Sequence, residues 1–341
     1  MNNAGTIKSI FPEYAIPGGE IAIECEGFHV DPEGSHGVIV DEGPCDIVAA
    51  SSRRVLAIVP EYSEGSSPVA LESFGEMSEP ADLTIGIRLV DDMHIVANPA
   101  IDPKNDTIVV TRSGSRGQKI DGVLYGLEAD EFIDRMPVEM MNPTGIAFDP
   151  VGDMYVTNRF DGEVVRIERG EEAVPYASGL GIATGIAFDA DGRMYVGDRG
   201  GMIYRVDPSG NHERFAGLEP SVAAYHLAFG PDGRLYVTAP GLASSDAVYA
   251  IDTDGGVTTY FRGFGRPQGL AFDREGNLYV AASYRGSRGI VRIDQSGIDA
   301  ELLVAGANVI GLCFSRQGEM IVATNTTVYS LEMNIYGTLL D

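Results

Sequence analysis

The 341-residue sequence has no tryptophan, five histidines and only three cysteines. Cys25, Cys45 and Cys313 have neither the number expected of a disulfide framework nor the paired spacing of a zinc site. No apolar run approaches the roughly 20 residues that a transmembrane helix needs, and the first residues lack the basic and apolar regions of a signal peptide. We therefore expect a cytoplasmic protein.

Positive charge is also scarce in this sequence. It has 24 basic residues against 50 acidic ones, which gives a formal net charge of −26. Phosphate backbones and anionic lipid surfaces would repel such a chain, so we expect no nucleic acid and no membrane among its partners. All basic residues except Lys8, Lys104 and Lys119 are arginines, whose guanidinium groups suit bidentate contacts with anions.

The most informative pattern is a motif that returns five times. Each copy has an aliphatic strand ending in Phe and an Asp-like residue, a turn centred on Gly, and a strand containing Met or Leu, Tyr and Val. The aligned phenylalanines follow one another at intervals of 40 to 43 residues and are Phe148, Phe188, Phe229, Phe272 and Phe314. That period holds four short strands and is too short for a βαβ unit, so it predicts the blades of a β-propeller.

The chain outside these five copies completes the predicted ring. The first blade begins at Ala97 and has Ile101 in the place of the phenylalanine. The last blade begins near Val309 and has only three clear strands before the chain ends. The segment 86–92, which precedes the first blade, can supply the missing outer strand. We therefore predict a six-bladed propeller over residues 86–341, closed by strands from both of its ends.

Residues 1–85 do not share the repeat. Their short alternating strands, separated by Gly and Pro, predict a small immunoglobulin-like β-sandwich in an all-β protein. The sequence Ile10-Phe11-Pro12, the turn Pro17-Gly18-Gly19, the pair Gly27-Phe28 and a later strand ending at Pro60 resemble the IPT/TIG domain. This resemblance implies a spacer or interaction module without chemistry of its own.

The repeats resemble NHL-repeat propellers and the six-bladed gluconolactonase family, also called the senescence-marker family. This resemblance implies lactone hydrolysis and a divalent metal such as calcium, held at the channel mouth by a Glu and several Asn or Asp side chains at the starts of the innermost strands. The corresponding positions here carry no carboxylate and are Ala97, Thr144, Thr184, His226, Gln268 and Ile310. We therefore expect no metal cofactor.

The mouth of the propeller channel is the candidate site. In a blade, the innermost strand starts on the face where the second strand ends, so two rows of side chains converge there. The residues predicted on this face are Arg112, Asn158, Arg159, Asp198, Arg199, Tyr225, His226 and Gln268, with Arg116, Arg266, Arg285 and Arg288 in adjoining loops. Clustered guanidinium groups beside amides suit a carboxylate, a phosphate or an acidic peptide. The alternative is that Arg159 and Arg199 pair with Asp161 or Asp198 and only brace the loops.

Catalytic signals are weak. His226 interrupts the repeated motif and is either a structural residue or a general base, for which Asp198 would be the orienting acid. The sequence has no nucleophile elbow, phosphate loop, HExxH motif or dinucleotide fingerprint. We therefore interpret the chain as a non-catalytic binding or scaffold protein for an anionic small molecule or a protein partner. The alternatives are a lactonase-like hydrolase with an altered metal site and an accessory subunit of a larger assembly.

Overall fold

The structure is a computed structural model that describes residues 4–31, 33–115, 118–127, 133–168, 172–242 and 245–338. Within these ranges the chain is all-β, as the sequence predicts. No helix there is long and apolar enough to cross a membrane.

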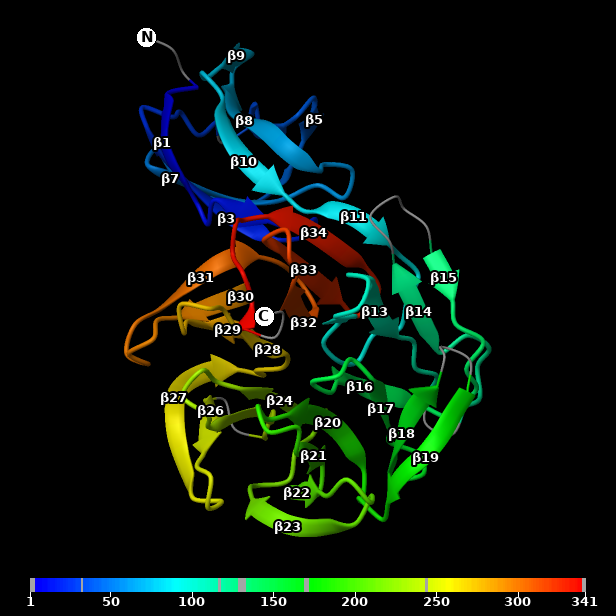
Figure 1. Cartoon of the computed structure of the whole chain (residues 1–341). Helices are drawn as coiled ribbons and strands as arrows, with labels where there is room; N and C mark the ends of the chain where they lie inside the picture. The colour runs from blue at the N-terminus through cyan, green and yellow to red at the C-terminus, as the bar shows by residue number, and fades with distance from the viewer. Residues whose placement is uncertain are drawn as a thin grey trace.

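Most of the chain forms a β-propeller, in which four-stranded antiparallel sheets are arranged around a central axis (Figure 1). Within a sheet the strands follow the sequence from the axis outward. One separate sheet contains β12 (Ala100–Ile101), β13 (Ile108–Thr111), β14 (Leu124–Leu127) and β15 (Ile133–Arg135). A second contains β16 (Pro143–Phe148), β17 (Met154–Asn158), β18 (Glu163–Glu168) and β19 (Glu172–Ser178). A third contains β20 (Ala183–Phe188), β21 (Met194–Asp198), β22 (Met202–Val206) and β23 (His212–Gly217).

Two further runs of four strands are joined by a pairing of β27 with β29. These runs are β24 (His226–Phe229), β25 (Leu235–Thr238), β26 (Asp246–Ile251) and β27 (Val257–Gly265), followed by β28 (Leu270–Phe272), β29 (Leu278–Tyr284), β30 (Ser287–Ile293) and β31 (Ala300–Ala305).

Strands from both ends of the propeller close the ring. The last sheet contains β32 (Val309–Phe314), β33 (Glu319–Thr324) and β34 (Val328–Glu332), and β11 (Ile87–Val90) pairs antiparallel with β34 on the outside. This confirms that the segment before the first repeat supplies the missing outer strand. Asn98 adds a second connection, because its Nδ2 donates to the Leu270 carbonyl at 3.0 Å and its Oδ1 accepts the Leu312 N–H at 3.2 Å.

The repeated Phe and Tyr hold neighbouring sheets together. A tyrosine on the second strand of one sheet packs on the phenylalanine that ends the first strand of the next sheet. Their ring centroids are 4.7 to 5.2 Å apart in the pairs Tyr155–Phe188, Tyr195–Phe229, Tyr236–Phe272 and Tyr279–Phe314. Tilted pairs of this kind contribute about 0.5–1.5 kcal/mol each beyond area burial. The motif therefore encodes contacts between sheets as well as strands within one sheet.

The aspartate of the motif closes the hairpin turn. Asp273 Oδ1 accepts the Asn277 N–H at 2.8 Å, and its Oδ2 accepts Asn277 Nδ2 at 2.8 Å and the Tyr279 hydroxyl at 2.9 Å. Gly276 has a φ of +87°, which a residue with a side chain rarely adopts. The Asp273 carboxylate thus links the turn to the second strand and, through Tyr279, to the aromatic contact between sheets.

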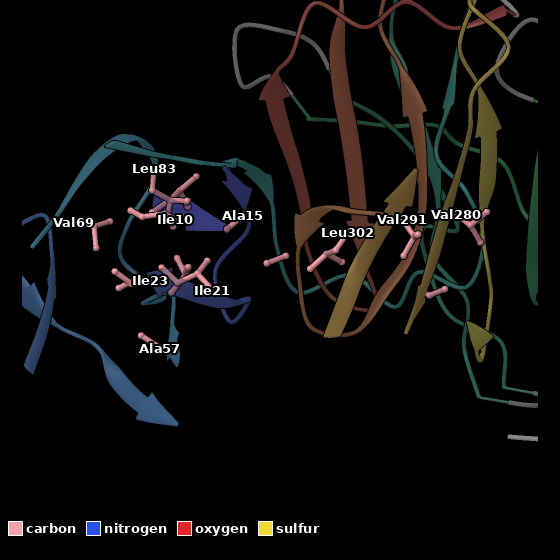
Figure 2. Close-up of a cluster of buried hydrophobic side chains, with 14 of the residues drawn as sticks. Ile10, Ala15, Ile21, Ile23, Ala57, Val69, Leu83, Val280, Val291 and Leu302 are labelled. Carbon is pink, nitrogen blue, oxygen red and sulfur yellow. The ribbon is translucent and has the colours of Figure 1, made fainter. Parts of the chain in front are cut away.

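The residues before β11 form two sheets with a shared buried core. One sheet contains β1 (Thr6–Phe11), β3 (Glu20–Glu26), β7 (Arg54–Ile58) and β6 (Asp46–Ala50), and the other contains β2 (Tyr14–Ala15), β10 (Ala81–Ile85), β8 (Gly65–Ser73), β4 (His36–Val40), β5 (Gly43–Pro44) and β9 (Glu76–Met77). The core includes Ile10, Ile21, Ile23, Ala57, Val69 and Leu83 (Figure 2).

The second of these sheets continues into the propeller. β2 lies between β10 and β31 and runs parallel to both, with Tyr14 opposite Thr84 on one side and Val304 on the other. The N–H of Ile16 donates to the Ala305 carbonyl at 2.8 Å. Both edges of a two-residue strand carry main-chain N–H and C=O groups that need hydrogen-bond partners once they are buried. The propeller strand β31 supplies these partners on one edge. The sequence pattern of residues 1–85 gives no sign of this continuity.

Candidate functional site

Two arginines follow the ends of neighbouring second strands at the candidate mouth. Arg159 comes directly after β17 and Arg199 directly after β21, and both are half-buried. Arg159 Nη2 donates to the Gly114 carbonyl at 3.2 Å, and Arg199 Nη2 donates to the Val222 carbonyl at 2.9 Å. Arg199 Nε is buried and has no hydrogen-bond partner among the described residues. Arg199 thus keeps an unused donor within the described ranges.

The two guanidinium groups are close enough to affect each other. Burial lowers the pKa of Arg159, and the charge of Arg199 lowers it further. Arginine stays protonated at neutral pH in spite of such shifts. Neither group forms an ion pair with a carboxylate in the part of the chain that the structure describes. Arg159 and Arg199, here called the arginine rim, are therefore two neighbouring guanidinium groups without a carboxylate partner among the described residues.

The acids that could have braced these arginines have other partners. Asp161 Oδ2 accepts Asn158 Nδ2 at 2.7 Å. Asp198 Oδ1 accepts two backbone N–H groups of the adjoining loops, at 2.7 and 2.9 Å. Both carboxylates therefore stabilise loop conformations, and the ion pairs considered as the alternative role of the arginines are not found between the described residues.

His226 is buried at the start of β24. It lies opposite Thr238 and is 4% exposed. Its Nε2 has no hydrogen-bond partner among the described residues, and burial lowers the pKa of the imidazole to about 4. The side chain is therefore neutral at pH 7. Among the described residues, no hydrogen bond joins His226 to Asp198. The structure therefore does not bring together the general base and orienting acid that the sequence suggested.

An axial cavity of about 1130 Å³ is enclosed by the first strands of the propeller sheets. Small side chains at aligned positions of its wall are Ala100, Ala147, Ala187, Ala228, Ala271 and Cys313. Tyr225 and His226 also line this cavity. The other candidates do not line it, and these are Arg112, Asn158, Arg159, Asp198, Arg199 and Gln268. The predicted site residues are thus divided between the axial cavity and the arginine rim.

The remaining candidates make contacts within the scaffold. The N–H of Arg112 donates to the Val123 carbonyl at 2.9 Å. The hydroxyl of the fully buried Tyr225 donates to the Glu219 carbonyl. Gln268 Nε2 donates to the carbonyl of Val309 at the start of the next first strand, at 3.3 Å. The last contact fastens two neighbouring sheets at the mouth.

Of the loop arginines, Arg285 stacks over the Tyr284 ring, with its guanidinium carbon 4.9 Å from the ring centroid. Arg266 and Arg285 both have positive φ angles, of 51° and 50°, while the Arg288 carbonyl accepts the Gly306 N–H at 3.0 Å. Arg116 lies outside the described residues.

The residues present do not fit a divalent metal. No group of three or more His, Cys, Asp or Glu side chains within the described ranges could hold an ion. Calcium and similar ions need several oxygen ligands, yet Thr184 Oγ1 donates to the Gly197 carbonyl at 3.3 Å and Gln268 bonds to Val309. The starts of the first strands hold the fold together instead of forming a ligand set.

The sequence analysis missed four exposed apolar side chains near the arginine rim. These residues, here called the apolar collar, are Phe160 (52% exposed), Ile182 (39%), Val222 (43%) and Leu242 (95%). Each one lies just beyond the end of a second strand or just before a first strand. The arginines were predicted from the same positions beside the strand ends. These positions could therefore have predicted the apolar collar as well.

Comparisons with known proteins agree with the fold. The model of the strictosidine synthase-like N-terminal family matches residues 185–206, and a search of curated proteins found no significant match. A gluconolactonase from Xanthomonas campestris is similar with a TM-score of 0.58 and 17% sequence identity, and the match covers 87% of this chain and 97% of that one. An auxiliary nutrient binding protein from Bacteroides thetaiotaomicron VPI-5482 has a TM-score of 0.57 and 12% identity, with 97% of this chain and 99% of that one covered. A virginiamycin B lyase from Staphylococcus aureus has a TM-score of 0.51 and 16% identity, with 87% of this chain and 99% of that one covered. At these identities the likenesses show the β-propeller fold alone.

Proposed function

We propose that this chain is a non-catalytic binding protein whose arginine rim holds an anionic ligand or an acidic part of a protein partner. The observation that carries this proposal is that neither Arg159 nor Arg199 has a carboxylate partner within the described residues. Guanidinium groups have five donors each, and bonds to carbonyl oxygens use few of them. A carboxylate or phosphate would engage the rest through charge-assisted hydrogen bonds.

The same proposal includes the architecture that presents the rim. We propose six blades over residues 86–341 and an IPT/TIG-like docking module over residues 1–85. The packing of the two N-terminal sheets on each other supports such a module, and their buried core continues into propeller residues such as Val291 and Leu302 (Figure 2). The net charge of −26 supports a protein that binds neither nucleic acid nor membranes, because both carry the same sign of charge. We also propose that the protein is cytoplasmic.

A lactonase-like hydrolase receives less support from the site. The likeness to gluconolactonases concerns the fold alone, and one fold hosts many activities. The described residues offer no fitting metal ligands, and Asp198 is bound to loop backbone instead of His226. The accessory-subunit alternative would place the partner contacts on blade loops or on the acidic outer surface and would leave the channel inert.

Thermal unfolding with added anions tests the proposed function. Citrate, phosphate and acetate are compared with sodium chloride at equal ionic strength. A ligand present at 100 times its Kd should stabilise the folded protein by about 2.7 kcal/mol. We expect a shift with at least one of these anions, lost in the Arg159→Gln/Arg199→Gln variant. The control is Arg53→Gln/Arg214→Gln, which removes the same two charges from exposed positions. A shift of the same size in all proteins, or no shift with any anion, would contradict the proposal.

A further inference from the structure

The apolar collar and the arginine rim form one surface. The Ile182 carbonyl accepts the Arg199 N–H at 3.2 Å, and the Val222 carbonyl accepts Arg199 Nη2 at 2.9 Å. The Val222 N–H in turn donates to the Pro240 carbonyl at 2.9 Å, two residues before Leu242. Hydrogen bonds thus join Arg199 directly to two members of the collar, Ile182 and Val222, and the bond from Val222 ends at Pro240, two residues from Leu242.

The collar continues on the side of the second arginine. Phe160 follows Arg159 directly and exposes 52% of its surface. Single exposed apolar residues are ordinary on a protein surface, but apolar patches rimmed by polar groups mark interaction sites. Aromatic and arginine side chains are also enriched at the centres of protein interfaces. Both features occur here within one group of loops.

We propose that this surface docks an acidic segment of a partner polypeptide in which Asp or Glu stands next to apolar side chains. The carboxylates bind Arg159 and Arg199, and the apolar side chains cover the apolar collar. This inference rests on the proposed function and specifies the class of its ligand.

Charge and exposure together favour a polypeptide over a small anion. A free phosphate or citrate would use the guanidinium donors and leave the collar in water. An acidic polypeptide would be repelled by most of a protein whose net charge is −26, so the rim would fix where it docks. Electrostatic complementarity of this kind selects partners and orientation more than it adds affinity.

The experiment selects peptides with the full chain. A phage-displayed library of random 12-residue peptides is panned on the protein, and Kd values of enriched peptides are measured by fluorescence anisotropy. We expect enriched peptides to combine Asp or Glu with Leu, Ile, Val or Phe. Their Kd should rise at least 10-fold in Arg159→Gln/Arg199→Gln and, separately, in Phe160→Ser/Leu242→Ser.

Two control variants carry matched changes at other places. Arg53→Gln/Arg214→Gln removes two charges from exposed positions, and Val48→Ser/Ile298→Ser replaces two apolar residues that are 53% and 76% exposed. Both should bind the selected peptides as the parent does. Unfolding curves of all variants confirm that each protein is folded under the conditions of the binding assay.

The outcomes separate this inference from the proposed function. An anion-dependent thermal shift without enrichment of any peptide overturns the inference and leaves the proposed function standing. Peptides that bind equally well to the Phe160→Ser/Leu242→Ser variant overturn it too. If vesicles of phosphatidylglycerol bind at the rim and peptides do not, the ligand is a lipid surface and the inference is wrong. Failure of anions and peptides alike overturns both proposals.

Discussion

Replacing His226 with leucine should make the protein less sensitive to acid. Burial lowers the pKa of the folded-state imidazole to about 4 from its ordinary value of 6.5. Between these two values the unfolded chain binds a proton that the folded chain does not. The stability that depends on the neutral imidazole is therefore fully present above pH 6.5 and is lost as the pH falls towards 4.

The size of this effect follows from the two pKa values. One pKa unit corresponds to 1.36 kcal/mol, so the full loss would be about 3 kcal/mol. Between pH 7.5 and pH 5 the expected loss is about 2 kcal/mol. At pH 7.5 the substitution also removes a buried Nε2 without a partner among the described residues, and such an unsatisfied group costs about 1–3 kcal/mol. His226→Leu should therefore be at least as stable as the parent at pH 7.5.

Urea unfolding at pH 7.5, 6 and 5 measures this difference. The control is His29→Gln, which removes an imidazole from an exposed position. Between pH 7.5 and pH 5, the free energy of unfolding should fall by about 2 kcal/mol more in the parent than in His226→Leu. Equal losses in the two proteins would refute the reasoning. A leucine variant several kcal/mol less stable than the parent at pH 7.5 would show that Nε2 has a partner, such as a bound water.

Two further predictions concern packing in the propeller and are measured by urea unfolding. Tyr279→Phe removes a 2.9 Å hydrogen bond to the carboxylate of its hairpin turn and should cost about 1.5–3 kcal/mol, whereas Tyr204→Phe, whose hydroxyl has no hydrogen bond within the described residues, should change little. Gly185→Ala would place a Cβ 2.6 Å from the Tyr225 carbonyl oxygen and should cost about 1–3 kcal/mol. At Gly217 an added Cβ would have nothing within 4 Å, so the free energy of unfolding of Gly217→Ala should lie within about 0.5 kcal/mol of that of the parent. Equal losses of stability for the two tyrosine variants, or for the two glycine variants, would contradict the packing described.

The propeller could be predicted because its contacts repeat along the chain. Tyr155 meets Phe188 through the same motif positions that join Tyr195 to Phe229, so the spacing of these residues reports a geometric relation between neighbouring sheets. The closing strand β11 could also be predicted from the sequence, because the last repeat lacks a fourth strand. Repetition turns a tertiary contact into a sequence pattern.

The site could be predicted only to the level of strand ends. Strand register placed Arg159 and Arg199 at the mouth, but the partner of a loop side chain depends on the path of the loops around it. Asp198 caps loop backbone for this reason instead of pairing with an arginine. The exposure of Leu242 and the burial of His226 also depend on neighbours distant in sequence, and neither follows a period.

The inserted strand β2 determines how force passes through the molecule. Tyr14 is paired with Thr84 on one edge and Val304 on the other, so a pull on the N-terminal sheets reaches β31 through main-chain hydrogen bonds as well as through the covalent link at β11. Swivelling about that link alone would tear these bonds. The first 85 residues are consequently held at a set angle to the propeller by main-chain pairing.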